Sequence, residues 1–310
     1  MKNLLASPLE GIITPMVTPL LDDYHLDFEG LQKLTQHLIS GGVHGIFILG
    51  TTGECTNISY ALRSSLIQET CLKVKGAVPV LVGITDTSME ESISLAKIAH
   101  KSGASAVVAA PPYYFGLGDV ELVDYYKKLA QALPLPLFLY NMPSHTKTML
   151  SQKVVVELSQ QANIIGLKDS SGNAVYFNSM VYAFRKQPDF SLLVGPEEMM
   201  AAAVLMGGHG GVSGGSNMFP KLYVDLYEAA RSGDLPLMAQ LQEMVMEISS
   251  ELYALGSYGS SYLKGLKAAL SILEISNGYL ATPMAAFGEE KLNLIRDKMT
   301  RLQAYMNYRS

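Results

Sequence analysis

The sequence predicts an α/β protein, a (β/α)8 TIM barrel with a C-terminal helical extension. Short β-rich apolar runs alternate with longer amphipathic stretches almost from the start of the chain. Eight such units follow one another at a spacing of roughly 20 to 35 residues, which is typical of parallel strands joined by crossover helices. The chain has 310 residues, more than the ~250 that a barrel needs, so we expect an additional segment after the barrel.

The expected strands are short apolar runs bounded by glycine, proline or other turn-forming residues. Continuous apolar runs of this length are typical of strands buried on both faces of a parallel sheet. In chain order the strands are expected at residues 11–14, 45–49, 79–83, 106–110, 136–140, 164–168, 191–194 and 211–213. The last has the weakest pattern because it is rich in glycine.

The expected helices repeat apolar residues at intervals of three and four. Within the barrel they lie at residues 27–40, 59–75, 90–101, 121–132 and 152–160. We assign residues 1–232 to the barrel and residues 233–310 to a helical extension packed on it, with helices at 235–255, 261–274 and 289–306. The alternative is a doubly wound open sheet, which is weakened because no G-x-G-x-x-G follows the first strand.

Composition excludes several classes of partner. The net charge is −5 and no Lys/Arg stripe is present, which argues against a nucleic-acid surface. No apolar stretch reaches the ~18 residues of a transmembrane helix, and no basic segment followed by a long apolar run opens the chain. Cys55 and Cys71 form no CxxC, so we expect no disulfide framework and a reducing, cytoplasmic location.

Lys168 ends the sixth expected strand, where the apolar run Ile164–Leu167 meets a polar, turn-forming cluster. A charged ammonium is costly to bury, so burial favours the neutral amine. A neutral amine is the nucleophile that forms a Schiff base with a ketone. The alternative is a strand-end lysine with a buried stem and a charged group that reaches water.

Polar groups follow most of the other strands as well. In a barrel, the carboxyl ends of the strands meet at one rim, and functional groups collect there. These strand ends supply hydroxyls, phenols and carboxylates, within residues 50–54, 111–115, 140–143, 195–198 and 214–217. Their convergence with Lys168 favours the catalytic interpretation of that lysine.

Each of these groups also has a structural alternative. Thr51 and Thr52 can bind a carboxylate through their hydroxyls and through nearby backbone N–H groups. Alternatively, they form a turn and a helix cap. The phenol of Tyr140 or Tyr114 is suited to moving protons beside an amine, or is an ordinary aromatic at the rim. The carboxylates of Glu197 and Glu198 can accept hydrogen bonds from substrate hydroxyls. Alternatively, the pair begins a helix after Pro196.

Other types of site have weaker support. The glycine-rich residues 207–215 lack the Lys-Ser/Thr ending of a P-loop, which leaves phosphate binding as a minor alternative. The six histidines show no H-x-x-x-H or H-E-x-x-H spacing, so no metal site is predicted. No G-x-S-x-G elbow follows a strand. A lysine-centred reaction needs neither a metal nor an organic cofactor, because the iminium itself accepts the electrons.

In their order and spacing, these motifs resemble those of the dihydrodipicolinate synthase / N-acetylneuraminate lyase family of class I pyruvate-dependent aldolases. The resemblance runs from Gly11 to at least Pro220 and is much less specific for substrate than for family. The matching motifs are GIITP at residues 11–15, Thr18-Pro19, GTTGE at 50–54, Pro112-Tyr113-Tyr114, Tyr140–Pro143, GLKDSSGN at 166–173 and GGHGGVSGGSN at 207–217.

The resemblance implies a role for each matching residue. Lys168 would form the Schiff base with the keto carbon of pyruvate, and Tyr140 would relay protons to and from the substrate. Thr51 would link Tyr140 into a chain of hydroxyls, and Thr52 would hold the pyruvate carboxylate.

Three further residues have implied roles. Tyr114 would enter the active site of a neighbouring subunit, which implies a homo-oligomer, either a dimer or a tetramer. Gly195 and Val212 would line the pyruvate pocket. The implied partner is a small 2-keto acid.

Residues 143–145 depart from the lysine-pathway synthases, which usually have arginine where this chain has His145. Histidine lacks the bidentate fork with which arginine binds a second carboxylate. Glu198, with Glu197, resembles the acidic pair of the sialic acid lyases. We therefore expect an N-acetylneuraminate lyase-like lyase or aldolase of a 2-keto-3-deoxy sugar acid, with His145 and Glu198 binding substrate. The alternatives are 4-hydroxy-tetrahydrodipicolinate synthase, a sugar acid dehydratase, and a catalytically silent keto-acid sensor.

Overall fold

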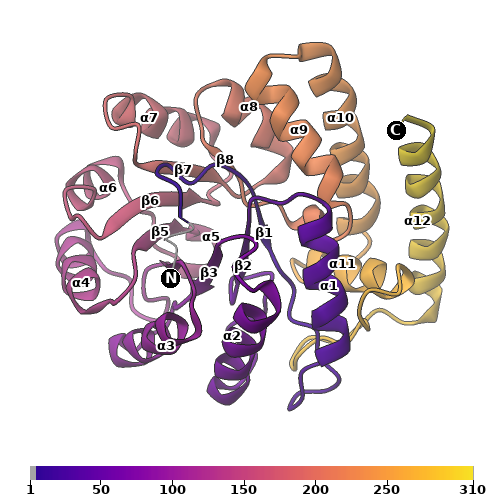
Figure 1. The fold of residues 1–310 in the computed structure, drawn as a ribbon, viewed down its shortest axis with the longest axis horizontal. Helices are drawn as coiled ribbons and strands as arrows, with labels where there is room; N and C mark the ends of the chain where they lie inside the picture. Colours follow the sequence, from indigo (N-terminus) through magenta and orange to yellow (C-terminus); the bar gives the residue numbers. More distant parts are fainter. Residues whose placement is uncertain (1–4, 310) are drawn as a thin grey trace.

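The computed structural model describes residues 5–309, with side chains described as far as residue 304. Eight parallel strands close into a barrel in which each strand pairs with the next and β8 pairs with β1 (Figure 1). The predicted TIM barrel is therefore confirmed. The strands are β1 (Gly11–Pro15), β2 (Gly45–Ile48), β3 (Val80–Gly83), β4 (Ala106–Ala109), β5 (Leu137–Asn141), β6 (Ile164–Asp169), β7 (Ser191–Val194) and β8 (Gly210–Gly211).

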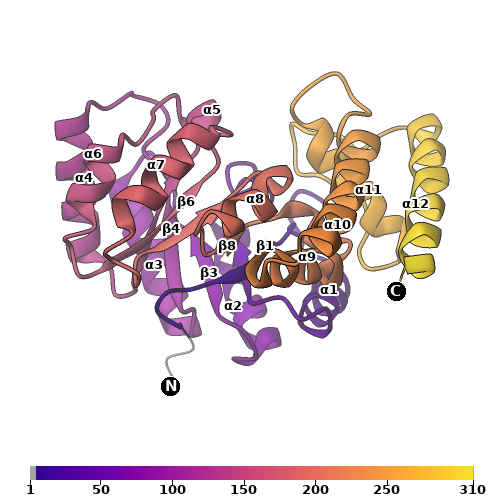
Figure 2. The same cartoon turned by 90° about the horizontal axis from the view of Figure 1, so that it is seen from above.

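Helices cover the outside of the barrel (Figures 1 and 2). They are α1 (Phe28–Ser40), α2 (Tyr60–Val74), α3 (Met89–Ser102), α4 (Asp119–Ala132), α6 (Gln152–Leu158), α7 (Ala174–Phe184), α8 (Met200–Leu205) and α9 (Pro220–Ser232). The short α5 (Pro143–Thr146) directly follows β5. Side chains cap the first turns of α1, α2, α3, α6 and α7, which fixes where these helices begin.

Eight strand-helix units imply a helix between the sixth and seventh strands, but the sequence pattern gives no residue range for it, and α7 lies there. Its eleven residues include Val175, Tyr176, Phe177, Val181 and Tyr182, which belong to types that favour strands. Buried residues nevertheless recur with helical spacing along α7, at Tyr176, Phe177, Met180 and Phe184. Packing against the barrel therefore outweighs the local preference of these residues.

The core has two layers. One fills the barrel interior and includes Ile13, Phe47, Leu81, Val108 and Phe138. The other lies between the strands and the surrounding helices. Every strand residue is buried except the half-buried Ile165, which explains why the strands appear in the sequence as continuous apolar runs.

The eighth strand differs from the expected residues 211–213 and consists of Gly210 and Gly211 alone. Gly210 has φ +155°, and a Cβ at this position would lie 2.0 Å from the carbonyl oxygen of Gly11. Only glycine fits this approach of β8 to β1 without displacing the backbone. The glycine that weakens the strand pattern is thus what allows the barrel to close.

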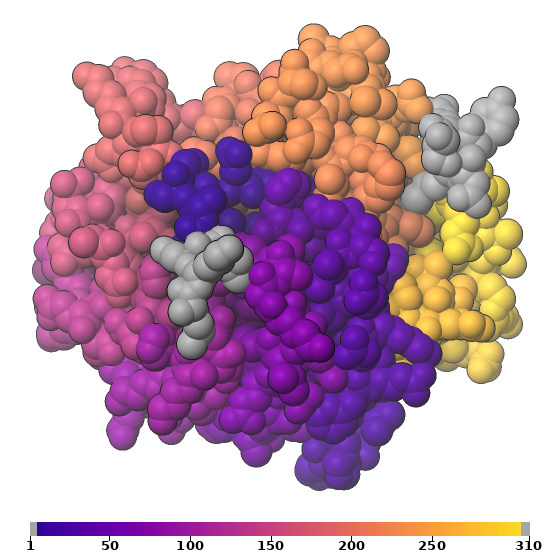
Figure 3. Space-filling model, viewed as in Figure 1, coloured from indigo at the N-terminus to yellow at the C-terminus, as the bar shows by residue number. Residues whose placement is uncertain are grey.

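After α9 the chain continues as α10 (Leu235–Ile248), a π-helical turn η3 (Ser249–Tyr253), α11 (Ser261–Ile272) and α12 (Glu289–Arg309). These elements lie on one side of the barrel, near α9 and α1 (Figures 1 and 2). The space-filling view shows the orange and yellow extension against the indigo N-terminal part (Figure 3). The division of the chain at residue 232 stays a prediction.

Among the described residues, no helix has the length and apolar character needed to cross a membrane. The expectation that no secretory signal opens the chain rests in part on residues 1–4, which lie outside the described residues.

Candidate active site

Lys168 and Tyr140 lie side by side inside the carboxyl end of the barrel. The register of β5 and β6 pairs the two residues directly, and they are only 6% and 5% exposed. Nζ of Lys168 lies 3.8 Å from the centroid of the Tyr140 ring and 5.0 Å from that of the Phe47 ring. Within residues 5–304, the side chain of Lys168 forms no hydrogen bond or ion pair. Its nitrogen lies against aromatic faces and leaves its lone pair, when neutral, free to attack a ligand.

The hydroxyl of Tyr140 is linked to the loop that follows β2. Its oxygen lies 3.3 Å from Oγ1 of Thr51, and Thr51 is exposed at the rim. The Tyr140 ring packs edge-on against Phe47, with centroids 6.5 Å apart. The two hydroxyls therefore form a chain that leads from the buried Tyr140 ring toward the exposed rim.

A cavity of about 280 Å³ opens above these groups. It is lined by all of the predicted site residues except Tyr114, namely Lys168, Tyr140, Thr51, Thr52, His145, Gly195, Glu198 and Val212. Residues far apart in the sequence and from five different strand ends therefore meet around one space.

The C-terminal extension supplies two cavity residues that the sequence analysis missed. Tyr253 of η3 and Tyr262 of α11 line the cavity, and their rings pack edge-on with centroids 4.8 Å apart. The Tyr262 hydroxyl lies 3.2 Å from Oγ1 of Thr52. The expected helix at 261–274 includes Tyr262, but periodicity does not show which part of the barrel a helix covers.

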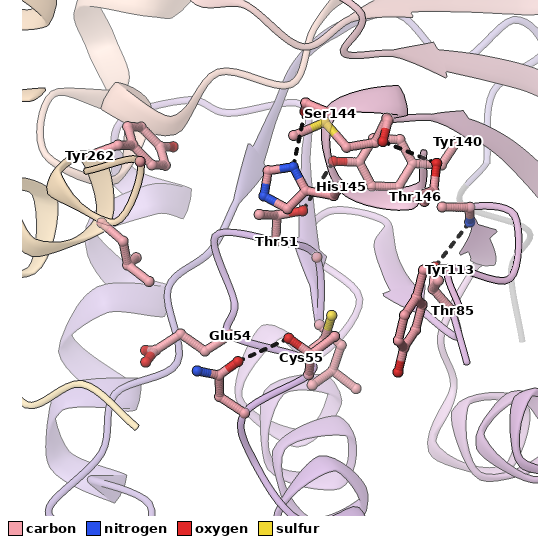
Figure 4. Close-up of a pocket in the computed structure, with 18 of the residues that line it drawn as sticks. Thr51, Glu54, Cys55, Thr85, Tyr113, Tyr140, Ser144, His145, Thr146 and Tyr262 are labelled. Atoms are coloured by element: carbon pink, nitrogen blue, oxygen red, sulfur yellow. Dashed lines mark hydrogen bonds between the residues drawn. The ribbon is translucent and has the colours of Figure 1, made fainter. Parts of the chain in front are cut away.

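A second cavity of about 500 Å³ adjoins the first and shares its wall at Thr51, Tyr140, His145 and Tyr262. Figure 4 shows His145 in this wall, above Thr51 and between the rings of Tyr140 and Tyr262. The second cavity provides room for the remainder of a ligand whose reactive end reaches Lys168.

Glu197 is buried, and both of its carboxylate oxygens accept hydrogen bonds from protein groups. Its Oε1 accepts hydrogen bonds from the hydroxyls of Tyr223 at 2.6 Å and Tyr253 at 2.9 Å, and its Oε2 accepts one from the Gly215 N–H at 2.7 Å. Burial raises the pKa of Glu197 to about 6, against the opposing effect of these donors. Its carboxylate holds protein groups in place at the wall of the cavity.

Glu198 has a different environment. It is half-buried, and its Oε1 accepts a hydrogen bond from Oγ of Ser249 at 2.5 Å. Within residues 5–304, no protein group donates a hydrogen bond to its Oε2. Of the acidic pair, Glu198 therefore has the carboxylate oxygen that is free to accept a hydrogen bond from a ligand.

His145 lies at the exposed rim, where its Nδ1 pairs with Oγ of Ser144 at 3.0 Å. Partial burial lowers the pKa of His145, and the positive charges of Lys147 and Lys168 lower it further. The imidazole is therefore a neutral polar group at neutral pH, with no bidentate fork to offer a carboxylate.

Tyr114 lies away from the cavities of its own chain. It is 79% exposed and packs edge-on against Phe115, which is 76% exposed, with ring centroids 5.2 Å apart. Its expected place in a neighbouring subunit stays a prediction.

No group of three or more His, Cys, Asp or Glu in the described part of the chain is arranged to hold a metal ion. The chemistry that these residues support is nucleophilic attack by an amine, assisted by a phenol.

The model of the dihydrodipicolinate synthetase family matches residues 8–302. The chain belongs to this family. The protein is therefore a class I lyase of the dihydrodipicolinate synthetase family, and the predicted resemblance is confirmed.

Several members of the dihydrodipicolinate synthetase family are similar to this chain. A probable 2-dehydro-3-deoxy-D-pentonate aldolase, YjhH of Escherichia coli K12, is 34% identical over 82% of this chain and 85% of its own. The structure of dihydrodipicolinate synthase from Bacteroides thetaiotaomicron is 54% identical, with a TM-score of 0.94 over 96% of this chain and 99% of that one. YagE of Escherichia coli K12, solved in complex with pyruvate, is 29% identical, with a TM-score of 0.89 over 95% and 98%.

Proposed function

We propose that the protein is a pyruvate-dependent aldolase that cleaves or forms a C–C bond of a 2-keto-3-deoxy sugar acid. The observation that supports this best is the buried Lys168, which has no ion-pair partner among the described residues and lies 3.8 Å from the Tyr140 ring. An amine in this setting is suited to attack on a ketone. The pyruvate complex of the similar protein YagE is consistent with this ligand class.

In the cleavage direction, the neutral amine of Lys168 attacks the C2 ketone of the substrate, and loss of water with uptake of one proton from solvent gives an iminium. Tyr140 accepts the proton of the C4 hydroxyl and passes its own hydroxyl proton to Thr51 as the C3–C4 bond breaks. The electrons of that bond move to the iminium and form an enamine, and the aldehyde leaves. A proton delivered through the same hydroxyls to C3 converts the enamine to the iminium of pyruvate, and hydrolysis then releases pyruvate, restores the free lysine and returns a proton to solvent.

The other cavity residues bind and orient the substrate. Thr52 holds the carboxylate, Thr51 passes the proton between Tyr140 and the rim, and Gly195 and Val212 shape the floor. A Cβ at Gly195 would lie 2.0 Å from Oγ of Ser170, so this position favours glycine.

Charge at the rim favours a neutral, hydroxylated aldehyde as the second fragment. Among the described residues that line the two cavities, Lys168 is the only lysine or arginine. A second carboxylate on the substrate would meet Glu198 without a counter-charge, whereas hydroxyls would donate to it. N-acetylneuraminate is one substrate of this hydroxylated class.

A second candidate is 4-hydroxy-tetrahydrodipicolinate synthase, favoured by the 54% identity to the structure of a dihydrodipicolinate synthase. A sugar acid dehydratase uses the same Schiff base, and a silent keto-acid sensor would bind without turnover. A screen for pyruvate release from 2-keto-3-deoxy sugar acids and N-acetylneuraminate, beside condensation of pyruvate with the semialdehyde substrate of the synthase, separates these activities.

The first test is reductive trapping of the Schiff base. Incubation with pyruvate and borohydride should add one adduct per chain, at Lys168, measured by intact mass and peptide mapping. Lys267, which is also buried but ion-paired, provides an internal control and should stay unmodified. Absence of an adduct, or an adduct at another lysine, would overturn the assignment.

We also propose a cytoplasmic homo-oligomer, either a dimer or a tetramer. The exposed aromatic pair Tyr114 and Phe115 supports an interface beside the site. The free thiols of Cys55 and Cys71 suit a reducing compartment.

A further inference from the structure

Glu54 and Lys267 form a buried ion pair to which the proposed reaction assigns no role. Their side chains are 0% and 1% exposed, and Nζ of Lys267 contacts Oε1 of Glu54. Lys267 also donates to the carbonyl oxygen of Tyr279 at 2.7 Å, and Oε2 of Glu54 accepts from the N–H of Ala281 at 2.8 Å. The pair thus connects the loop after β2 with α11 and the segment that follows it.

The loop after β2 has a backbone that needs support. Leu49, at the start of the loop, and Glu54, in its middle, have φ of +57° and +56°, a region that residues with a Cβ rarely occupy. Such a conformation persists when the surrounding contacts compensate for its cost. Between these two residues lie Thr51 and Thr52, the hydroxyl residues that face the cavity.

Helix α11 reaches this loop at two points. Tyr262 contacts the Thr52 hydroxyl, and Lys267, five residues later on the same helix, contacts Glu54. From the barrel side, Oγ1 of Thr18 donates to the carbonyl oxygen of Gly53 at 2.7 Å. The loop is therefore held between the barrel and the extension.

We propose that Glu54 and Lys267 are positioning residues, through which α11 fixes the loop that presents Thr51 and Thr52 to the substrate. This inference rests on the proposed function, because it assigns the substrate carboxylate to Thr52. Lys267 lines neither cavity, so it acts only through the loop. The extension is then part of the catalytic apparatus as well as a cover for the barrel.

The variant Lys267→Met tests this proposal, since it keeps the bulk of the side chain and removes the ion pair. The readout is the pyruvate concentration that gives half-maximal borohydride trapping at Lys168, measured by intact mass on folded protein. We expect this concentration to rise about tenfold, the change that accompanies loss of one good polar contact. The conservative variant Lys267→Arg should restore part of the affinity, because it keeps the charge.

A matched control separates positioning from general loss of stability. Leu270 lies three residues further along α11 and is fully buried, so Leu270→Ala weakens the packing of the same helix and leaves the ion pair intact. This variant should lower Tm as Lys267→Met does and keep the half-saturating pyruvate concentration of the wild type. An equal rise in both variants would overturn the proposal.

The milder variant Glu54→Gln, which keeps size and loses charge, decides the question if Lys267→Met does not fold. A rise in the half-saturating concentration supports the proposal, and a wild-type value overturns it. If the wild-type protein itself traps no pyruvate, the proposed function fails and this inference fails with it. If the wild type traps pyruvate and the variants have the same half-saturating pyruvate concentration as the wild type, only this inference is overturned.

Discussion

Lys168 and Lys267 are both buried, yet their surroundings give them different chemistry. Lys267 lies against the carboxylate of Glu54. Burial lowers the pKa of Lys267, although the negative charge of Glu54 acts in the opposite direction. Lys168 lies against the faces of Tyr140 and Phe47 and has no ion pair among the described residues. An ion-paired amine is a poor nucleophile, whereas an unpaired one beside a phenol is suited to Schiff-base formation.

At the residue scale, we first predict the effect of Tyr140→Phe. This change removes the proton-relay hydroxyl and keeps the ring that packs on Lys168, so turnover should fall about 10²- to 10⁴-fold. Trapping of pyruvate at Lys168 should persist. The control Tyr176→Phe removes another buried hydroxyl, which donates to the Leu150 carbonyl oxygen, and should leave turnover unchanged. Near-normal turnover of Tyr140→Phe in a steady-state assay would contradict the relay.

Also at this scale, Glu197 should make stability depend on pH. Burial raises its pKa from 4.5 to about 6, so the folded state binds this proton more tightly than the unfolded state. The resulting stabilisation is complete below pH 4.5 and is lost as pH rises through about 6, a change of about 2 kcal/mol.

The measurement for Glu197 is the free energy of unfolding in urea, followed across this pH range for the wild type and Glu197→Gln. The wild type should lose about 2 kcal/mol relative to the variant as pH rises. The slopes are compared, and not the absolute values, because the amide also changes the bonds to Tyr223 and Tyr253. Parallel curves would show that Glu197 has no such role.

At the scale of elements, η3 places two side chains on the acidic pair. Ser249 at its first position contacts Glu198, and Tyr253 at its last position contacts Glu197. Single π-helical turns inside helices occur often at functional sites. Here the turn brings the end of α10 onto the segment after β7, so the extension shapes the wall of the cavity.

The corresponding prediction concerns Glu198→Ala. Loss of the free carboxylate oxygen should raise KM for a hydroxylated keto acid about tenfold. The pyruvate concentration that gives half-maximal trapping should change less. The control Glu247→Ala removes an exposed acid of α10 and should change neither quantity. Equal changes for both ligands would favour the alternative in which Glu198 only begins a helix.

At the scale of the whole molecule, the exposed Tyr114 supports a test for shared active sites. Lys168→Ala subunits should be inactive, and Tyr114→Ala subunits should have reduced activity. If Tyr114 acts in the neighbouring site, mixed oligomers should be more active than either parent, because a Lys168→Ala subunit donates its intact Tyr114 to a site with an intact lysine. Activity after subunit exchange, compared with the unmixed variants, is the measurement. The absence of any gain in verified mixed oligomers would place Tyr114 outside the neighbouring site.

The alternation of apolar runs and amphipathic stretches determined the barrel, because strands buried on both faces need continuous apolar residues. It also determined which residues follow each strand, and hence that Lys168, Tyr140, Thr51 and Thr52 share one rim. The sequence pattern gave no residue range for α7 and a different range for β8, since packing against the barrel decided the first and backbone closure the second.

Only the tertiary structure decided how the extension meets this rim. Tyr262 and Thr52 are 210 residues apart in the sequence, and Lys267 and Glu54 are 213 apart. Helical periodicity shows that a face is buried, but not against which loop, and a buried ion pair is apparent only when both partners are placed. The sequence by itself therefore determined that the amine and the phenol lie at the same rim, whereas long-range packing decided which residues of the extension surround them.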